Sequence, residues 1–438
     1  MLPVVARLDI RILNMLSVSK LSNGMRIVTD TDSNSDTVSL GVWASVGARY
    51  ESPEINGISH VLEHMAFKGT LKRSALQISE EIENVGGIIN AYTGKEMTAY
   101  YVKVLKEDLA LGLDIIADIL QNSQMDAGEL EKEKGVICQE INMQNDTPDE
   151  MVFDYMSETA FPNQALGRSI AGTCEIVRSI TSKQLLDYMH TQYIADRMII
   201  SASGNFDADA FKNMCETAFA SIGNHEVQGA EPAHYVGGDK RVEKANEQVN
   251  LILGFNGISY KDKDYYATRL MSAILGGGMS SRLFQEIREK RGLVYTISSF
   301  NIPESDAGTF AIYAGTGEKE VTELMPVLCD EILKLKGTIT DTELTRAKNR
   351  LKARLLMNAE AISTHAEMNA TDMIVHGRVV PKEEIIADIA AITTADLDKV
   401  CERIFSSRPT FASLGPIKHV MSYDEVCSRL GYKENAKF

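Results

Sequence analysis

The sequence has no run of 18 or more uncharged apolar residues, so no membrane-spanning helix is expected among its 438 residues. It also has no C-x-x-C pair, and its six cysteines lie far apart, which excludes a disulfide framework and a cysteine metal site. Basic residues are outnumbered, with 45 Lys and Arg against 61 Asp and Glu and a net charge of −16. We therefore expect no nucleic-acid partner, because nothing offsets the repulsion of phosphates.

The length predicts two to four domains, and an apolar content of 44% with 24% charged residues is that of a globular protein. The first residues lack the continuous apolar core and cleavage site of a secretory signal. We expect residues 1–16 to form an N-terminal extension, with a short organelle-targeting leader as the alternative. The reduced cysteines indicate a cytosol-like compartment, the cytoplasm, with the mitochondrial matrix as the alternative.

Apolar periodicity and turn signals predict the elements of the first half. Residues 18–30 predict two strands joined by an Asn23-Gly24 turn. Gly86-Gly87 is expected to end a helix. We expect helices at 57–67, 74–85, 107–122 and 127–144, and strands at 37–46, 88–93, 97–106 and 198–204.

Residues 224–246 are polar and glycine-rich, which predicts a linker. After it the pattern restarts, with strands at 247–255, 293–300 and 309–314, a helix at 265–275 and a second helix ending at Arg291. An offset of 205 to 207 residues brings Gly276 opposite Gly69 and Gly292 opposite Gly87, a weak indication of duplication.

We therefore predict an α+β fold of two homologous αβ domains, each a mostly antiparallel sheet flanked by helices, joined by a linker. The first domain is expected to cover residues 17–223 and the second residues 247–438. The positions in the second half that match His60, Glu63 and His64 are apolar (Ala267, Leu270 and Met271). If the halves are repeats, only the first can hold a metal.

The segment G-I-S-H-V-L-E-H-M-A-F-K-G carries the strongest chemical signal. At about 100° per residue, His60, Glu63 and His64 share one helix face. Histidines one turn apart can ligate one ion, and this is the inverted form of the H-E-x-x-H zinc helix. Two histidines could share a solvated face by chance, but the segment is otherwise apolar, where unpaired polar groups are costly. We predict one zinc ion per chain, with Glu63 as the general base.

A catalytic zinc site needs a third protein ligand and an open position for water. The other histidines are scattered and form no motif. The segment E-K-E-K-G-V-I-C-Q-E offers Glu133 and Glu140, which are seven residues apart on one helix face. The spacing does not decide between them.

At this point the sequence resembles the pitrilysin-type zinc metallopeptidases, most closely the beta subunits of mitochondrial processing peptidases and their bacterial relatives. The resemblance covers nearly the whole chain. It is carried by H-V-L-E-H-M-A-F-K-G-T at 60–70, G-G-I-I-N-A-Y-T at 86–93, E-K-G-V-I-C-Q-E at 133–140 and S-R-L-F-Q-E-I-R-E-K-R-G-L-V-Y at 281–295.

The resemblance implies that Glu140 is the third zinc ligand and Glu133 a supporting carboxylate. It also implies that Arg282 and Tyr295 of the second domain reach the substrate and the developing oxyanion. The substrate is then a peptide, hydrolysed by zinc-activated water.

The resemblance further implies residues that bind the substrate. Asn90 and Ala91 belong to an edge strand to which the peptide adds as another strand. Phe67 lines the pocket just after the scissile bond, and Glu150 and Asp154 hold an arginine two residues before it.

The processing enzyme of this family pairs with a partner subunit that has a long glycine-rich loop. The loop here, Gly276-Gly277-Gly278, is short, so we expect two equal chains enclosing a chamber, a homodimer with one zinc in each chain. Two alternatives stay open: a general oligopeptide-degrading peptidase, and a non-catalytic structural subunit like the core proteins that share this fold. Retention of all four motif residues argues against the second.

Overall fold

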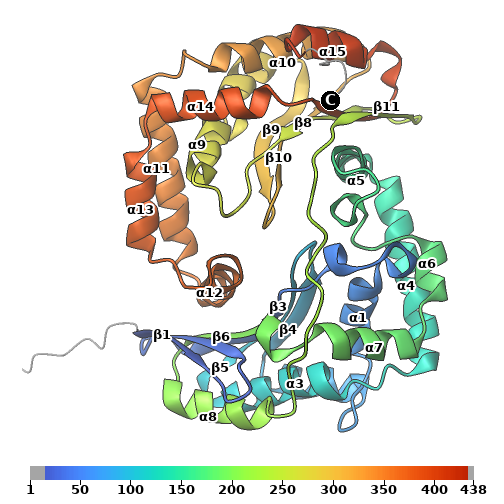
Figure 1. Cartoon of the computed structure of the whole chain (residues 1–438), viewed down its shortest axis with the longest axis vertical. Helices are drawn as coiled ribbons and strands as arrows, with labels where there is room; N and C mark the ends of the chain where they lie inside the picture. The colour runs from blue at the N-terminus through green and yellow to red at the C-terminus, as the bar shows by residue number, and fades with distance from the viewer. Residues whose placement is uncertain (1–14, 433–438) are drawn as a thin grey trace, which may run out of the picture.

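The structure is a computed structural model that describes residues 15–432. The two halves of the chain form two units stacked along the long axis of the molecule, each built on one sheet (Figure 1). An extended segment between the last helix of the first unit and the first strand of the second runs along one side and joins them (Figure 1).

The first sheet has six strands in the order β1-β2-β6-β3-β5-β4. Only β2 and β6 pair in parallel. The strands are β1 (Met15–Lys20), β2 (Arg26–Thr31), β3 (Thr37–Ala44), β4 (Ile88–Thr93), β5 (Thr98–Leu105) and β6 (Met198–Gly204). The helices are α1 (Ile58–Ala66), α2 (Ala75–Asn84), α3 (Leu109–Asn122), α4 (Ala127–Asp146), α5 (Pro148–Ala160), α6 (Cys174–Ser179), α7 (Ser182–Gln192) and α8 (Ala208–Ala218).

The second sheet has five strands in the order β7-β11-β8-β10-β9, and only β7 and β11 are parallel. The strands are β7 (Gly238–Glu243), β8 (Val249–Asn256), β9 (Val294–Pro303), β10 (Gly308–Thr316) and β11 (Thr410–Gly415). The helices are α9 (Tyr265–Gly276), the π-helical turn η6 (Phe284–Glu289), α10 (Val321–Leu335), α11 (Asp341–Asn358), α12 (Ile362–His376), α13 (Lys382–Ala391), α14 (Thr394–Phe405) and α15 (Tyr423–Arg429). The predicted fold of two mostly antiparallel sheets flanked by helices is confirmed.

Local signals explain several element boundaries. Gly24 has a φ of 95°, a left-handed conformation that glycine adopts without steric cost, at the predicted turn between β1 and β2. Ser74 accepts a hydrogen bond from the backbone of Gln77, whose side chain accepts one from the Ser74 backbone; this capping box begins α2. Gly86, with a φ of 66°, follows the end of that helix.

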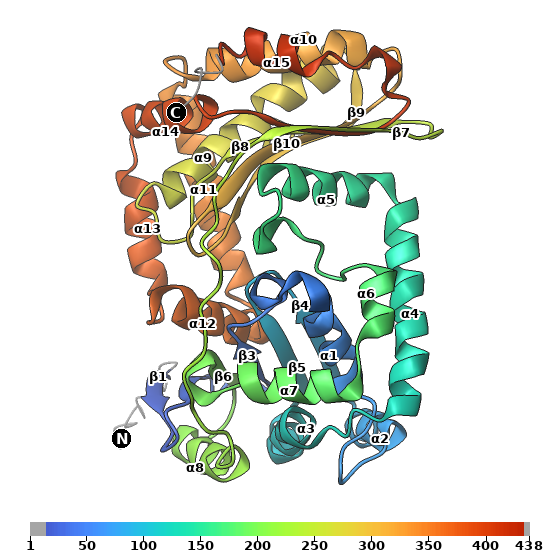
Figure 2. The ribbon, with the colours of Figure 1, turned by 45° about the vertical axis from the view of Figure 1, so that its right-hand side comes forward.

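Each sheet is covered on one face by helices of its own half and on the other by one helix of the opposite half. Val152 and Met156 of α5 pack on Ile252 of β8 and Ala412 of β11. In return, α12 packs on the first sheet, with Ala366, Ala370 and Met373 against Val28, Trp43 and Ile199. Figures 1 and 2 both show α5 beneath the second sheet and α12 beside the first. The two halves are therefore joined by this exchange as well as by the connecting segment.

Two predicted boundaries differ from the structure. The range 224–246, predicted to be a linker, contains β7, which pairs in parallel with β11. β7 is an edge strand with the charged sequence GDKRVE, so its composition resembles that of a loop. The predicted extension 1–16 overlaps β1, which begins at Met15; residues 1–14 lie outside the described residues.

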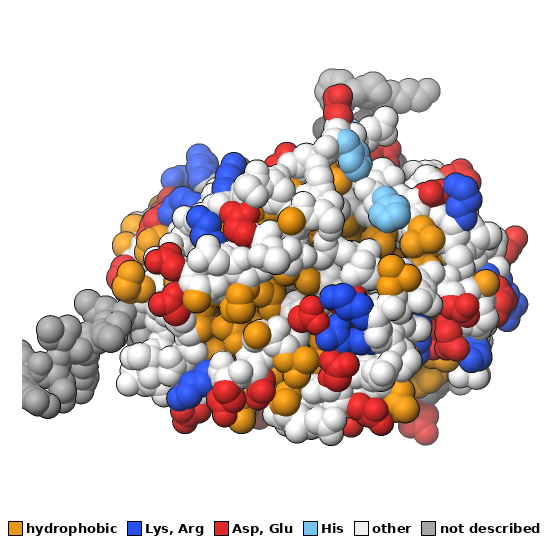
Figure 3. Space-filling model, turned by 90° about the horizontal axis from the view of Figure 1, so that it is seen from below, with side chains coloured by type: hydrophobic (Ala, Val, Ile, Leu, Met, Phe, Trp, Pro, Cys, Tyr) orange, Lys and Arg blue, Asp and Glu red, His pale blue; other side chains and the backbone are white. Residues whose placement is uncertain are grey.

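Within residues 15–432, no helix combines the length and apolar character needed to cross a bilayer. On the face of the first half seen from below, acidic and basic side chains are interspersed (Figure 3). That face therefore offers no continuous basic surface.

Candidate metal centre and peptide cleft

Helix α1 divides its side chains between the core and a cleft. Val61, Leu62 and Met65 are buried in the core of the first half. His60, Glu63 and His64 are half-buried on the opposite side of the helix. The spacing that suggested a metal therefore also places these three groups away from the core.

Three potential ligand atoms converge there. The carboxylate of Glu140, on α4, lies 3.9 Å from Nε2 of His60 and 3.5 Å from Nε2 of His64. The ligand atoms of all three residues lie within 4.8 Å of one another, the only such group found in the described part of the chain. Ligand atoms about 2.1 Å from a tetrahedral ion would be roughly 3.4 Å apart, so the three side chains fit a zinc ion.

His60 is in the state that ligation requires. Burial, and secondarily His64, lowers the pKa of His60 to about 4, so its imidazole is neutral near pH 7. Nδ1 of His60 is buried without a hydrogen-bond partner among residues 15–432. The accessible nitrogen of His60 is therefore Nε2, the one that faces Glu140.

Glu133 lies behind this group and not within it. One of its oxygens is 3.1 Å from Nδ1 of His64, and the other is 2.6 Å from Nζ of Lys68. Burial raises the pKa of Glu133, but hydrogen bonds from Lys68 and His64 more than offset this and lower it overall. A carboxylate in this position fixes the ring orientation and tautomer of His64, the usual role of a group behind a ligating histidine. These distances favour Glu140 over Glu133 as the third ligand.

The carboxylate of Glu63 is held by a neighbour that the sequence analysis did not single out. Oγ1 of Thr93, the last residue of β4, donates a 2.5 Å hydrogen bond to Glu63. Burial raises the pKa of Glu63, and the Thr93 hydrogen bond opposes that shift. The only sequence signal for Thr93 was its place at the end of G-G-I-I-N-A-Y-T.

His60, Glu63 and Glu140 open onto a cavity of about 530 Å³, whose lining does not include His64. It is bounded by α1, α4, α5 and β4, and its lining includes His60, Glu63, Ala91, Tyr92, Thr93, Glu140, Gln144, Glu150 and Asp154. β4 is the edge of its sheet, so one side of its backbone is free of strand pairing. An extended chain can add there as a further strand within reach of the metal ligands.

Some of the predicted peptide-binding residues line this cavity and others do not. Glu150 and Asp154, both on α5, line it together with Ala91. Asp154 accepts a 3.0 Å hydrogen bond from Gln144, and burial raises its pKa while the charge of Lys95 opposes that shift. Asn90 lies on the same edge strand as Ala91, and its side chain accepts a hydrogen bond from the backbone of Ala91.

Phe67 directly follows the last residue of α1, and its half-buried ring lies 6.3 Å from that of Tyr100. It is not part of the cavity lining.

Arg282 and Tyr295 are not brought to the cavity within one chain. Arg282 donates to Glu343 at 2.7 and 2.9 Å, inside the second half. Tyr295 is 75% exposed at the start of β9. A motif match gives residue types but not the distance between two domains, which explains why sequence reasoning placed them at the site.

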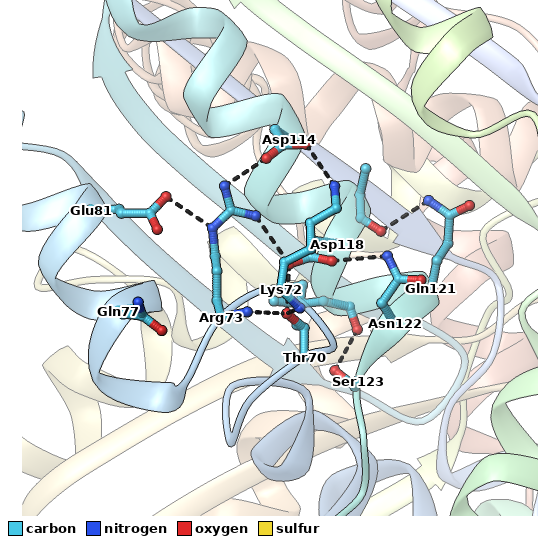
Figure 4. A network of polar contacts seen from close by, with 12 residues as sticks. Thr70, Lys72, Arg73, Gln77, Glu81, Asp114, Asp118, Gln121, Asn122 and Ser123 are labelled. Carbon is cyan, nitrogen blue, oxygen red and sulfur yellow. Dashed lines mark hydrogen bonds and ion pairs between the residues drawn. The ribbon is translucent and has the colours of Figure 1, made fainter.

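The loop after α1 is anchored by buried charge (Figure 4). Arg73 pairs with Glu81, Asp114 and Asp118, and Oγ1 of Thr70 donates a 2.6 Å hydrogen bond to Asp118. Asp118, on α3, is almost fully buried. The C-terminal end of the helix that carries the histidines is thereby tied to α3.

Comparison with known families gives two matches. The model described as insulinase (peptidase family M16) matches residues 26–174, and the model described as the peptidase M16 inactive domain matches residues 179–351. The first match contains the histidines, Glu63 and Glu140. The second match begins in the first half, at residue 179, and ends within α11 of the second half, where the motif positions are apolar.

The chain also aligns with known proteins over nearly its full length. The chain is 40% identical over 401 residues to an uncharacterized zinc protease of Rickettsia felis, covering 91% of this chain and 97% of that protein. It is 34% identical over 427 residues to the mitochondrial-processing peptidase subunit beta of Bos taurus, covering 94% and 87%. A protease from Helicobacter pylori has the same fold, with a TM-score of 0.84 at 23% identity over 92% of this chain and all of that one.

Proposed function

The chain belongs to peptidase family M16, and from that premise we propose that it is a zinc-dependent endopeptidase with one zinc ion per chain. The observation that carries the proposal is the convergence of His60, His64 and Glu140 beside Glu63 in a cleft bordered by an open sheet edge. A structural subunit would have no need of this complete set.

His60, His64 and Glu140 would hold the metal, and zinc bound there supplies a Lewis acid for hydrolysis of the peptide bond. Glu63 takes the proton of the attacking water and delivers it to the leaving amine. Thr93 holds the Glu63 carboxylate by its hydrogen bond, and Glu133 holds the ring of His64. Each catalytic group is thus oriented by a second side chain.

The peptide lies along β4 as an added strand, with Asn90 and Ala91 presenting the backbone to which it pairs. Phe67 contributes to the pocket after the scissile bond. Glu150 and Asp154, four residues apart on one face of α5, favour arginine two residues before that bond. This preference makes the enzyme a processing-type peptidase; without it, the chain is a general oligopeptidase.

We further propose that two copies of the chain associate and enclose a chamber. Because Tyr295 and Arg282 lie outside the cavity of their own chain, a second copy would bring them to it. The test combines a Glu63→Gln chain with a Tyr295→Phe chain. If sites are shared, the mixture regains part of the activity that each variant lacks; additive activities, or a monomer by light scattering, would contradict the homodimer.

The principal test of the function uses Glu63→Gln and His64→Ala. Glu63→Gln keeps a polar side chain of the same size without basicity, so zinc should remain bound while cleavage of a quenched fluorescent peptide is abolished. His64→Ala should lose the zinc, measured by elemental analysis of the same preparation. More than a few per cent of unmodified turnover in Glu63→Gln would remove Glu63 as the base, and stoichiometric zinc in His64→Ala would remove the metal assignment.

A further inference from the structure

The second half contains a cavity that corresponds to the zinc cleft in position but is opposite in charge. It has a volume of about 540 Å³ and lies between α9, the edge strand β9 and α11. In the first half the zinc cleft is bounded by α1, the edge strand β4 and α4. α11 packs against α9 as α4 packs against α1.

The charge is exchanged at a matching position. Glu140 lies fourteen residues after Asp126, the N-cap of α4, and Arg354 lies fourteen residues after Thr340, the N-cap of α11. A carboxylate that suits a cation in the first half is thus replaced by a guanidinium in the second.

Arg354 is one of three arginines that line this cavity; the others are Arg269 and Arg350. Among the residues that the structure describes, no acidic side chain lines this cavity. Within residues 15–432, none of the three arginines has an ion-pair partner, although the whole chain carries a net charge of −16. We name Arg269, Arg350 and Arg354 the arginine cluster.

Two of these side chains are held in place by their surroundings. The guanidinium of Arg269 lies 5.7 Å from the centre of the Tyr265 ring, within the range of a cation–π contact. The guanidinium of Arg350 lies against Gly278, where any side chain would overlap it. The short glycine loop that follows α9 therefore makes room for Arg350.

The cavity also has features that suit a peptide. β9 is an edge strand, and Ser298, Phe300 and Asn301 of that strand line the cavity beside the unpaired backbone. Tyr260 and Tyr265 add aromatic surface to the cavity. An extended chain can pair with β9 while a carboxylate meets the arginines, whose planar guanidinium groups match a carboxylate in two-point geometry.

We propose that the arginine cluster is an anion subsite that binds a carboxylate of the peptide substrate, either its C-terminus or an acidic side chain. The inference rests on the proposed peptidase function in taking a peptide as the ligand. It gives the metal-free half a binding role of its own.

The test measures binding and not cleavage, on zinc-loaded Glu63→Gln protein, so that it does not depend on turnover. Four fluorescent decapeptides differ only at two points: the C-terminus is an acid or an amide, and one internal residue is Glu or Gln. The Kd of each peptide is measured by fluorescence anisotropy at low salt. The peptide with the relevant carboxylate should bind about tenfold more tightly than its neutral counterpart. The acid–amide pair reports the C-terminus as the source, and the Glu–Gln pair reports the side chain.

In the triple variant Arg269→Gln, Arg350→Gln, Arg354→Gln, the Kd of the neutral peptide divided by the Kd of its carboxylate counterpart should fall to about one. The pair compared is the one that differs on the parent protein. Arg350→Lys should retain part of the ratio, because it keeps the charge but not the forked geometry. Arg346→Gln is the matched control, since Arg346 lies on α11 one turn from Arg350 and outside this cavity. Equal Kd values for both peptide pairs on the parent protein, or an unchanged ratio in a triple variant with native circular dichroism, would overturn the subsite. Cleavage of the peptides by Glu63→Gln would overturn the proposed role of Glu63 as the base. It would not overturn the subsite, which is tested by the ratio of Kd values.

Discussion

Glu133 and Glu140 lie seven residues apart on α4 but differ in their partners. Glu140 faces both imidazoles, whereas Glu133 pairs with His64 and Lys68. We therefore expect Glu140→Gln to lose both zinc and activity, because it removes a ligand charge. Glu133→Gln should lose activity with a smaller loss of zinc, on the order of 10- to 100-fold in affinity. Zinc titration against a chelator distinguishes them, and equal losses in the two variants would reverse this assignment.

Specificity for arginine is also decided by single residues. A partly buried charge-assisted contact of about 1.5 to 3 kcal/mol would favour arginine over norleucine, two residues before the cut, by roughly ten- to a hundredfold in kcat/KM. Lysine should substitute poorly, because it cannot bridge Glu150 and Asp154 in a forked geometry. Asp154 is already stabilised by the nearby charge of Lys95 and by a hydrogen bond from Gln144. A bound arginine would therefore gain less from this carboxylate, so we expect a preference near tenfold.

The measurement is a matched peptide pair, arginine against norleucine, assayed on the parent enzyme and on the double variant Glu150→Gln, Asp154→Asn. The preference should shrink in the variant, while the norleucine peptide reports the general effect of the substitutions. Equal rates for the two peptides on the parent enzyme would exclude a processing-type peptidase and leave a general oligopeptidase.

Among the elements, α12 joins the second half to the first sheet through polar contacts as well as apolar packing. Nδ1 of His365 lies 2.6 Å from Oδ2 of Asp30, and the hydroxyl of Tyr92, which lines the zinc cleft, donates a 2.9 Å hydrogen bond to Glu367. The hydrogen bond to Asp30 raises the pKa of His365, and burial only partly opposes it. The edge strand β4 is thus held by a helix of the other half.

This contact predicts a pH dependence of stability. Because the folded-state pKa of His365 is above its unfolded value of about 6.5, its contribution is fully present below that pH. It should be lost as pH rises through the raised folded pKa. In urea unfolding from pH 5.5 to 9, the free-energy difference between the parent and His365→Gln should therefore be largest at the acidic end. His190→Gln, an exposed histidine on α7, is the control; a pH-independent difference for His365→Gln would contradict the prediction.

The elements that local sequence signals specify were predictable, and those that depend on distant partners were not. The structure confirms the Asn23-Gly24 turn, the helix that carries His60 and His64, and the pairing of β4 with β5. These features were predictable because turn residues and apolar spacing act within a few residues. Helix α5 was missed, and its packing on the second sheet could not be inferred, since an apolar helix face does not specify which sheet covers it. β7 was missed for the same reason, because its partner β11 is far away in the sequence.

At the scale of the whole molecule, the exchange of α5 and α12 means that neither half has both faces of its sheet covered by its own helices. Separating the halves would expose apolar surface on each sheet and on each exchanged helix. We expect one cooperative thermal transition for the intact chain. Two resolved transitions in calorimetry would contradict this expectation.

A buried arginine connects the same parts of the molecule. The guanidinium of Arg49, only 2% exposed, contacts Glu96 at 2.5 Å in the turn between β4 and β5, and Asp306 at 2.7 Å in the turn between β9 and β10. It also donates to the backbone oxygen of Glu231 in the connecting segment at 2.7 Å. Nearby, burial, and next the charge of Glu96, raises the pKa of Glu304 to about 8. Carboxylates of both halves and a backbone carbonyl of the segment between them therefore meet at the Arg49 guanidinium.

We predict that Arg49→Met destabilises the protein by about 1 to 3 kcal/mol, because it removes the cation beside Glu96, whose side chain is only 16% exposed. Asp306 adds less to this loss, because its side chain is 41% exposed and it keeps a hydrogen bond from the backbone of Ala233. The control Arg291→Met removes an arginine of exposed ion pairs within the second half and should cost clearly less, because exposed ion pairs are screened by solvent. Adding Glu96→Gln and Asp306→Asn to Arg49→Met should recover part of the loss, since the unpaired charges are then removed with the arginine. Chemical unfolding of the four proteins at pH 7 provides the comparison. A loss in Arg49→Met no greater than in the control, or no recovery in the triple variant, would mean that the buried ion pairs do not hold the two halves together.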